Sequence, residues 1–276
     1  MTSISTSELT QDMIRLTDEA ALAVPFSQRH PGFSMDDGYR VAREVLALRE
    51  QSGWRRVGRK IGFSNRLILD QYGVTGPVFG YMYDRTLSEA GEQGGRFSAA
   101  LPLTGLAQPL IEPEIAFRLR SRPPATRDPL ELLRHIEWMA HGFEVVQCHF
   151  PGWKFATADA VADGGLHGRY ILGPKRLVDR DDPAALAAAL ASFRVTLFKN
   201  GEPAAAGGGA NVLDSPLNAL GYLIETVEGL PGHPPLAAGE IITTGTLTKA
   251  FPVAAGETWS TRIEGLALAG LKLRFE

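Results

Sequence analysis

Apolar residues near the start of the chain recur at the spacing of a helix. They occupy every third or fourth position over about 7–22 and again over about 36–51, which predicts two amphipathic helices. Gly53 is expected to end the second helix, and residues 25–35 are expected to form a linker between the two. This pattern predicts a small helical subdomain over residues 1–56.

After residue 56 the pattern changes to short apolar runs separated by glycine and proline, which is typical of β-strands. The Asn200-Gly201 pair lies between two apolar runs and predicts a two-residue hairpin. The predicted strands are 57–62, 78–82, 111–119, 143–148, 169–172, 193–198, 241–244, 259–263 and 267–275.

Three further helices are predicted among these strands. They cover 129–135, 184–193 after the Asp182-Pro183 pair, and 216–227 with Ser215 as the N-cap. These helices do not alternate regularly with the strands, which argues against a doubly wound parallel sheet. We therefore expect an α+β fold in which residues 57–276 form a sandwich or a roll.

The composition narrows the class of function. The 276 residues include 28 Lys and Arg against 31 Asp and Glu, and this balance argues against broad binding to nucleic acid or to an anionic membrane. Cys148 is the single cysteine, so an intrachain disulfide is excluded and a reducing, cytoplasmic location is expected. We expect neither a signal peptide nor a membrane span, because no basic leader precedes an apolar run and no such run approaches the roughly 18 residues that cross a bilayer.

The first candidate for chemistry is a pair of glutamates on the strand predicted over 111–119. Period-2 geometry places Glu112 and Glu114 on one face, about 7 Å apart. Two carboxylates on an apolar strand repel each other and are costly to desolvate, and a hard divalent cation would offset that cost. An edge strand with a solvated acidic face would explain the same pattern.

Glu144 is a lone acid in the apolar run 143–146, where it either forms a buried salt bridge or joins the glutamate pair. Three carboxylates would suit Mg²⁺, whose open positions would bind a 2-oxo acid and activate it as a Lewis acid. Lys60 lies between Gly58 and Gly62 and is either a surface lysine or a proton carrier whose pKa a nearby cation would lower.

Other polar residues allow two interpretations each. Asp159 and Asp163 are four residues apart and would share one face of a helix, where they either cap it or support a site. Residues 207–211 form a glycine-rich loop before the helix at Ser215, which either binds an anion or makes a tight turn. This loop lacks the signatures of phosphate and dinucleotide loops. The threonine-rich segment 243–248 could bind a carboxylate.

Taken together, these segments resemble the 2-keto-4-pentenoate hydratase / 4-oxalocrotonate decarboxylase family of the fumarylacetoacetate hydrolase superfamily. The resemblance runs in order from about residue 57 to the C-terminus. It implies a mixed β-roll of the fumarylacetoacetate hydrolase C-terminal-domain type and an Mg²⁺ or Mn²⁺ ion held by Glu112, Glu114 and Glu144. The matching blocks are 58–62, 111–116, 144–146, 159–163, 209–218 and 238–245.

The resemblance also implies residue roles. Lys60 and Asp163 are expected to be catalytic, and a second group of residues is expected to bind substrate. The chain has Cys148-His149 where the family has Ser-Arg, and Gly-Gly-Leu-His over 164–167 where the family has an Asn-Ala-Ser-like run. We expect one of the two histidines to replace a polar interaction that these changes remove. The expected substrate-binding residues are Gly209, Asn211, Thr246, His149 and His167.

Substrates of such enzymes are 2-hydroxydienoates and their 2-oxo tautomers, which are intermediates of aromatic meta-cleavage. The first expectation is a hydratase that ketonises the dienol and adds water at carbon 4. The alternatives are a 2-oxo-3-hexenedioate decarboxylase and an acylpyruvate hydrolase. The hydrolase is less favoured because His30 has no glutamate one helical turn away. A non-enzymatic partner scaffold is a further alternative, against which the intact glutamates and Lys60 argue. A homo-oligomer is expected, with a complex with a pathway partner enzyme as an extension.

Overall fold

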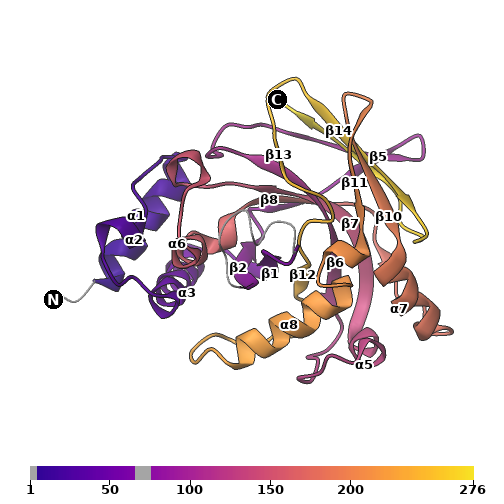
Figure 1. Ribbon diagram of the computed structural model, residues 1–276, viewed down its shortest axis with the longest axis horizontal. Helices are drawn as coiled ribbons and strands as arrows, with labels where there is room; N and C mark the ends of the chain where they lie inside the picture. The colour runs from indigo at the N-terminus through magenta and orange to yellow at the C-terminus, as the bar shows by residue number, and fades with distance from the viewer. Residues whose placement is uncertain (1–4, 66–75) are drawn as a thin grey trace.

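The computed structural model describes residues 5–65 and 76–276, which fold into two mixed β-sheets flanked by helices. Figure 1 shows the N-terminal helices at one end of the molecule and the sheets curling around each other at the other end. This arrangement confirms the α+β class and a roll of mixed sheets. No helix in the described ranges has the length and apolarity that a bilayer crossing requires.

The nine-stranded sheet has β6 and β7 at its centre and runs in the order β2-β1-β12-β6-β7-β8-β3, with β13 beside β6 and β9 beside β7. Most neighbours are antiparallel, but β1 pairs with β12 and β3 with β8 in parallel. Its strands are β1 Arg56–Gly62, β2 Val78–Tyr83, β3 Leu87–Glu89, β6 Leu110–Leu119, β7 Ile136–Val146, β8 His167–Leu172, β9 Arg176–Leu177, β12 Ile241–Thr243 and β13 Phe251–Pro252.

The six-stranded sheet runs in the order β11-β10-β14-β15-β5-β4 and packs on the first sheet through an apolar core that includes Phe143, Trp259 and Leu273. The predicted hairpin is confirmed between β10 and β11, where Asn200 and Gly201 both adopt positive φ. The strands of this sheet are β4 Gly91–Gln93, β5 Arg96–Leu101, β10 Arg194–Lys199, β11 Glu202–Gly208, β14 Thr258–Glu264 and β15 Leu271–Phe275.

The predicted helices form, and polar side chains cap them, as expected for Asp182 and Ser215. Ser34 and Asp37 make a capping box at the start of α3, Asp182 caps α7, and Ser215 caps α8. The helices α5, α7 and α8 cover the first sheet through a second apolar core. The helices are α1 Thr6–Glu19, α2 Phe26–Arg29, α3 Met35–Gln51, α5 Pro129–Arg134, α6 Thr157–Ala162, α7 Pro183–Ser192 and α8 Pro216–Glu228.

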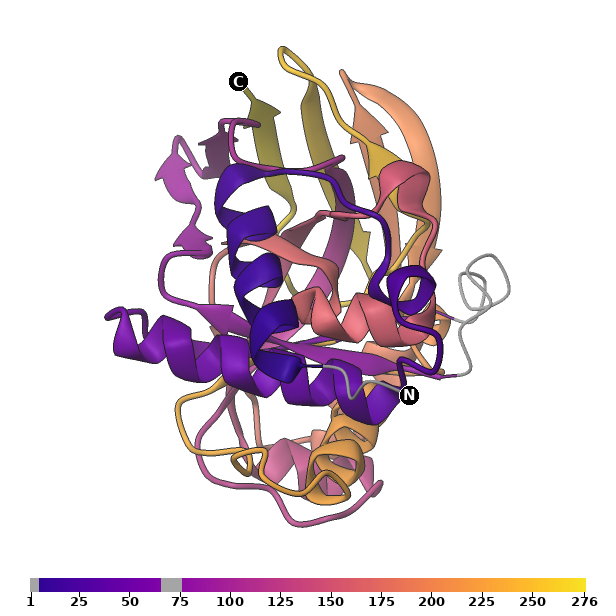
Figure 2. The same cartoon turned by 90° about the vertical axis from the view of Figure 1, so that its left-hand side faces the viewer.

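The N-terminal helices pack against α6 rather than against each other alone. Leu9 and Met13 of α1, Val41 of α3, and Ala158 and Ala162 of α6 share one apolar cluster. Figure 2 shows α1 and α3 lying over the end of the sheet from this side. A division of the chain at residue 56 stays a prediction.

Several sequence expectations need correction. The segment 25–35 contains the short helix α2 and is not only a linker. The strand expected over 143–148 begins at Ile136 and ends at Val146, because His141 and Gly142 interrupt its apolar run without breaking its pairing to β6. The strand expected from residue 267 begins at Leu271. The short strands β3, β4, β9 and β13, together with β5 and β11, carry too little apolar alternation to be expected.

Candidate metal and substrate site

Three glutamates converge on one face of the paired strands β6 and β7. Glu112 and Glu144 are directly opposite each other in the antiparallel register, and Glu114 lies two residues further along the same face. Each offers a carboxylate oxygen, and these oxygens lie within 4.8 Å of one another. Gly142 stands opposite Glu114, where a Cβ atom would lie 2.5 Å from the ring of Tyr170. The expected proximity of the three acids is therefore present.

The cluster has more acidic groups than nearby positive charges, and this imbalance shifts the pKa values of its carboxyls. Burial raises the pKa of Glu112 to about 7 and that of Glu114 well above its usual range, against the attraction of Lys60. Burial also acts on Glu144, but Lys60 and His167 outweigh it and lower the pKa of this carboxyl. The cluster thus lacks the positive charge needed to keep all three groups ionised.

The buried oxygens of the cluster are incompletely partnered. Glu114 Oε2 accepts the Gly245 N–H at 2.9 Å, and Gly245 has a φ of +98°, which suits glycine. Glu114 Oε1 has no hydrogen-bond partner among the described residues. Buried carboxylate oxygens are rarely left unpartnered, and hard oxygen ligands are what Mg²⁺ prefers. The donor set therefore fits a divalent cation.

Lys60 completes the cluster from strand β1. Its Nζ donates to the Gly165 carbonyl at 2.9 Å and lies 3.2 Å from Glu144 Oε2. Only 3% of the residue is exposed, so the interpretation of Lys60 as a surface lysine is wrong. Desolvation lowers the pKa of Lys60, but the three glutamates outweigh it and raise the pKa above its ordinary value. The lower pKa expected for Lys60 from the sequence depends on a divalent cation beside this lysine.

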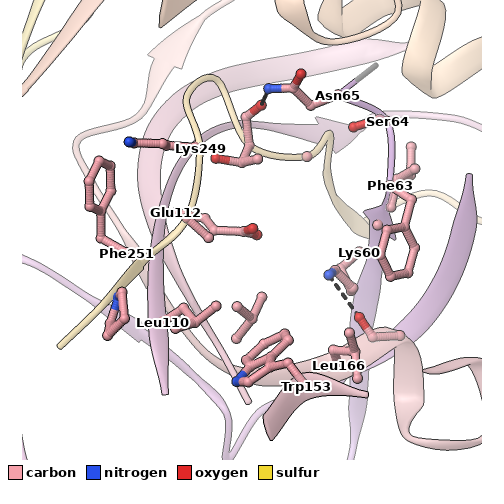
Figure 3. A pocket seen from close by; sticks show the side chains of 18 residues that line it. Lys60, Phe63, Ser64, Asn65, Leu110, Glu112, Trp153, Leu166, Lys249 and Phe251 are labelled. Carbon is pink, nitrogen blue, oxygen red and sulfur yellow. Dashed lines mark hydrogen bonds between the residues drawn. The ribbon is translucent and has the colours of Figure 1, made fainter. Parts of the chain in front are cut away.

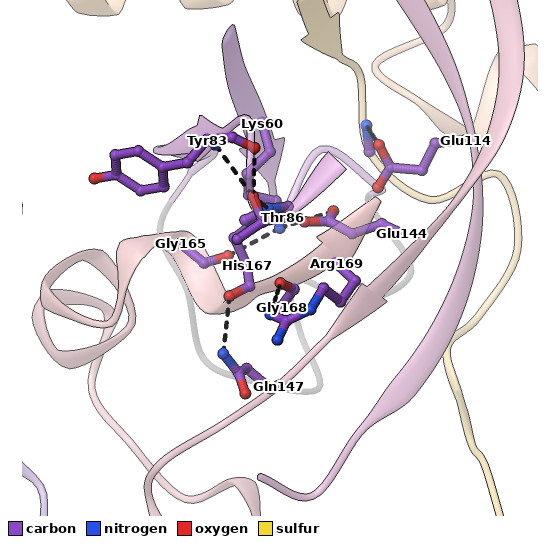
Figure 4. Close-up of polar contacts among 11 residues, drawn as sticks. Lys60, Tyr83, Thr86, Glu114, Glu144, Gln147, Gly165, His167, Gly168 and Arg169 are labelled. Carbon is purple, nitrogen blue, oxygen red and sulfur yellow. Dashed lines mark hydrogen bonds and ion pairs between the residues drawn. The ribbon is translucent and has the colours of Figure 1, made fainter. Parts of the chain in front are cut away.

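His167 lies behind Glu144 at the start of β8. Its Nδ1 is 2.9 Å from Glu144 Oε1, and its Nε2 is 2.9 Å from the hydroxyl of Thr86, as Figure 4 shows. Burial lowers the pKa of His167, which leaves the ring neutral. Because an ionised carboxylate can only accept, the neutral ring donates from Nδ1 and accepts at Nε2. His167 therefore orients Glu144 rather than facing the cavity described next.

A cavity of about 420 Å³ opens above Lys60 and Glu112 (Figure 3). Thr246 lines it as expected, and its hydroxyl donates to the Thr248 carbonyl at 2.9 Å. Most of the wall was not expected from the sequence, since its residues come from loops, single turns and strand ends with no distinctive spacing. The further side chains labelled around the cavity in Figure 3 are Phe63, Ser64, Asn65, Leu110, Trp153, Leu166, Lys249 and Phe251.

Asp163 and His149 form a buried pair beside α6. Asp163 Oδ1 lies 2.6 Å from His149 Nδ1, and Oδ2 accepts the His149 backbone N–H at 3.1 Å. Burial raises the pKa of Asp163 although His149 opposes the change. Neither residue lines the cavity above Lys60. Asp159 accepts hydrogen bonds from Ser27 and from the Ala156 N–H, which matches its expected capping role.

Gly209 and Asn211 lie in a single 3-10 turn, η3, behind the threonine-rich segment. Asn211 Nδ2 donates to the Leu247 carbonyl at 2.8 Å, next to Thr246. A Cβ atom on Gly209 would collide with the carbonyl oxygen of Leu190, so this glycine permits close packing onto α7. Neither residue lines the cavity. The substrate-binding and catalytic roles assigned from the sequence stay predictions.

Comparisons with known proteins agree with this geometry. The family model described as "Fumarylacetoacetate (FAA) hydrolase C-terminal" matches residues 96–271. The chain is 34% identical to a 2-hydroxyhexa-2,4-dienoate hydratase of Comamonas testosteroni, over 92% of this chain and 91% of the relative. It is 31% identical to a 2-keto-4-pentenoate hydratase of Paraburkholderia xenovorans (strain LB400), over 96% and 94%.

The fold is shared over nearly the whole length with a solved structure. A 4-oxalocrotonate decarboxylase from Pseudomonas putida G7, complexed with magnesium and adipate, superposes with a TM-score of 0.86 at 25% identity and covers 99% of both chains. From the family match and the identity to these relatives, the chain belongs to the fumarylacetoacetate (FAA) hydrolase family.

Proposed function

We propose that this protein is a divalent-metal-dependent hydratase that adds water to a 2-hydroxy-2,4-dienoate and forms a 4-hydroxy-2-oxo acid. The observation that carries the proposal is the cluster of Glu112, Glu114 and Glu144, of which Glu112 lines a cavity together with Lys60. The similarity to a 2-hydroxyhexa-2,4-dienoate hydratase supports this reaction over the others that the fold hosts. The protein is then a lyase.

The three glutamates would hold Mg²⁺ or Mn²⁺, with Glu144 oriented by His167. Such an ion, when bound, supplies Lewis acidity toward the 2-oxo and carboxylate oxygens of the substrate. Glu114 Oε1 has no hydrogen-bond partner among the described residues, and burial raises the pKa of Glu112. A bound ion would pair with this oxygen and would favour the ionised form of Glu112.

Lys60 is placed to move protons. Ketonisation removes a proton from the enol oxygen and delivers one to carbon 5, and addition of water at carbon 4 then delivers one to carbon 3. Lys60 Nζ borders the cavity, and its contacts with Gly165 and Glu144 hold it in one orientation. An ammonium held in this way can give a proton to a substrate carbon. It can then take a proton back from the enol oxygen or from the water that adds.

The cavity walls favour a substrate with an apolar tail. Phe63, Leu110 and Trp153 surround the space beyond Glu112, and such side chains stabilise an alkyl or alkenyl end better than a second carboxylate. This composition supports a monocarboxylate dienoate.

One observation favours the second candidate, a decarboxylase of 2-oxo-3-hexenedioate. Lys249 lines the same cavity, is exposed, and makes no ion pair with the part of the chain that the structure describes. A lysine at this position would attract the distal carboxylate of a diacid. An acylpyruvate hydrolase has no such observation in its favour.

A paired assay tests the proposal. Purified protein with Mg²⁺ receives 2-hydroxypenta-2,4-dienoate in one reaction and 2-oxo-3-hexenedioate in another, and dienol absorbance, carbon dioxide and product mass are followed. Glu114→Gln is the inactive variant, and Glu202→Gln, an exposed change on β11, is the matched control. A product heavier by one water from the first substrate supports the hydratase, whereas carbon dioxide from the second replaces it with the decarboxylase.

If neither substrate reacts and the protein does not bind Mg²⁺, the non-enzymatic scaffold is favoured instead. A homo-oligomer and a complex with a pathway partner enzyme stay predictions from the family resemblance, and a cytoplasmic location stays a prediction from the single cysteine. Sedimentation of the purified protein would test the first of these directly.

A further inference from the structure

A second cavity, of about 280 Å³, lies between the N-terminal helices and the sheet. Its walls come from α1 and α3 on one side and from β2 and β8 on the other. It is separate from the cavity above Lys60. The 3-10 turn η2, Gly164–Leu166, stands between the two, because Gly165 and Leu166 line the first cavity while Gly164 and the next residue, His167, line the second.

Arg169 brings an unbalanced positive charge to this second cavity. Among the residues that the structure describes, its Nη1 donates to the carbonyl of the preceding residue, Gly168, at 2.8 Å and to no other group (Figure 4). The side chain is half-buried and forms no ion pair within residues 5–65 and 76–276. Desolvation lowers the pKa of Arg169, and no acidic group offsets that effect. A guanidinium in this position favours an anion as its partner.

The other charged groups of the cavity are already satisfied. Arg49 binds Asp18 through two hydrogen bonds of 2.6 and 3.2 Å, and its guanidinium lies 4.4 Å from the ring of Trp54. Both oxygens of Asp163 are engaged by His149. Arg169 is therefore the cation in this cavity that the described residues leave without a counterion.

The rest of the wall is largely apolar or aromatic. Trp54, Tyr81 and Tyr83 line one part, and Met13 and Val45 line another. Desolvation raises the pKa of both tyrosines, to about 12 for Tyr81, so the phenols are neutral and supply no negative charge. The cavity thus combines one cation with a surface that would hold a compact hydrocarbon body.

We propose that this second cavity binds a small carboxylate with an aromatic or aliphatic body. The carboxylate pairs with the Arg169 guanidinium, and the body packs against the tyrosines and Trp54. This ligand is distinct from the substrate of the proposed reaction, which would bind over Lys60 and Glu112. Because η2 also provides the Gly165 carbonyl that holds Lys60, the ligand would lie against the wall that positions the reactive lysine.

Binding of 4-fluorobenzoate, followed by ¹⁹F NMR on the full chain with Mg²⁺, tests the proposal. We expect saturable binding that Arg169→Gln weakens about tenfold or more, the cost of losing a charge-assisted pair. Arg169→Lys keeps the positive charge but loses the bidentate geometry of the guanidinium. Its affinity for the probe should lie between that of the parent and that of Arg169→Gln. Arg262→Gln, on the exposed face of β14, and the neutral probe 4-fluorobenzyl alcohol are the matched controls.

Two results would overturn the proposal. One is binding that Arg169→Gln and Arg169→Lys leave unchanged although circular dichroism shows both variants folded. The other is binding that disappears in Lys249→Gln instead, because that change places the probe in the first cavity. Neither result depends on hydratase activity, so the two proposals fail independently.

Discussion

Glu112 and Glu144 occupy directly opposite positions on the antiparallel strands β6 and β7. Like charges at such positions destabilise a sheet, and here a third carboxylate lies beside them, with Lys60 as the buried cation that the described residues place against the three acids. A protein that keeps this arrangement gains something from it other than stability. A divalent cation, which the three glutamates would hold under the proposed function, would provide that gain.

Glu114→Gln should separate metal binding from folding. The variant loses a carboxylate ligand but also removes a carboxyl whose burial disfavours its ionised form, so without Mg²⁺ it should be at least as stable as the parent. Mg²⁺ at 100 times its dissociation constant should stabilise the parent by about 2.7 kcal/mol, and this gain should largely disappear in the variant. Thermal unfolding with and without Mg²⁺ measures both effects, and an equal Mg²⁺ shift in the two proteins would contradict the assigned ligand.

Arginine should replace the charge of Lys60 but not its function in proton transfer. Lys60→Arg keeps a cation near Glu144, yet arginine does not release its proton near neutral pH. We expect kcat to fall by about 10²–10⁴, the range for a lost general acid–base, while the dissociation constant for Mg²⁺ changes little. Hydrogen–deuterium exchange at carbon 3 of a 2-oxo acid gives a second readout, and exchange at the parent rate in Lys60→Arg would remove this residue from the proton path.

His167 should affect metal binding through its hydrogen bond to Glu144. Removing its ring in His167→Ala takes away the donor to Glu144 Oε1, and removal of such a hydrogen bond commonly lowers metal affinity about 10–100-fold. His167→Asn retains a short side chain that can donate at the same place, so it should recover part of the affinity. Calorimetric titration with Mg²⁺ distinguishes the two, and equal affinities in both variants would mean that the hydrogen bond does not position the ligand.

The sequence pattern was sufficient to predict the α+β class, the two long N-terminal helices and the acidic face of β6. Period-2 spacing places Glu112 and Glu114 together because both lie on one strand. The position of Glu144 opposite Glu112 depends on the register between β6 and β7, and no local pattern encodes a register across 32 residues of chain. The apolar run around Glu144 makes this residue a candidate but leaves a buried salt bridge as an alternative, and the family resemblance is what assigns it to the metal site.

Residues whose role comes from long-range packing were not predictable in this way. Trp153 lines the first cavity from a single 3-10 turn, and Arg169 lines the second from strand β8. Each is one polar or aromatic residue in a segment of ordinary composition. Its importance arises only when helices and sheet enclose a space around it.

Gly142 should be intolerant of a side chain. A Cβ atom there would lie 2.5 Å from the ring of Tyr170, which fills the space opposite Glu114. Gly142→Ala should lower the free energy of unfolding by about 1–3 kcal/mol, as overpacking of a core does. The same change in a Tyr170→Ala background should cost less, while Gly91→Ala on the edge strand β4, where space is available, should stay within about 0.5 kcal/mol. Chemical denaturation measures each value, and equal costs for Gly142→Ala in both backgrounds would show that the ring is not the obstacle.

His233 should make the protein less stable in mild acid. Its Nδ1 lies 2.7 Å from the Tyr81 hydroxyl, and its ring packs edge-on against Tyr39 and Phe79. Desolvation, with repulsion from two nearby arginines, lowers its pKa from 6.5 to about 4. Between these two values the unfolded chain binds a proton that the folded chain does not, so stability falls as the pH drops through this window and is unaffected by this group above it.

Both His233→Gln and His233→Phe remove this titration, and Phe also keeps the ring contacts. Their free energies of unfolding should therefore fall less steeply than that of the parent between pH 6.5 and 4, whatever their stability at pH 7. Tyr81→Phe is the control, because it removes the hydrogen bond but keeps the buried imidazole and so should retain the pH dependence. Urea unfolding at several pH values gives the slopes. Parallel curves for the parent and both His233 variants would show that other groups, such as the buried His141, whose pKa desolvation also lowers to about 4, cause the acid sensitivity instead.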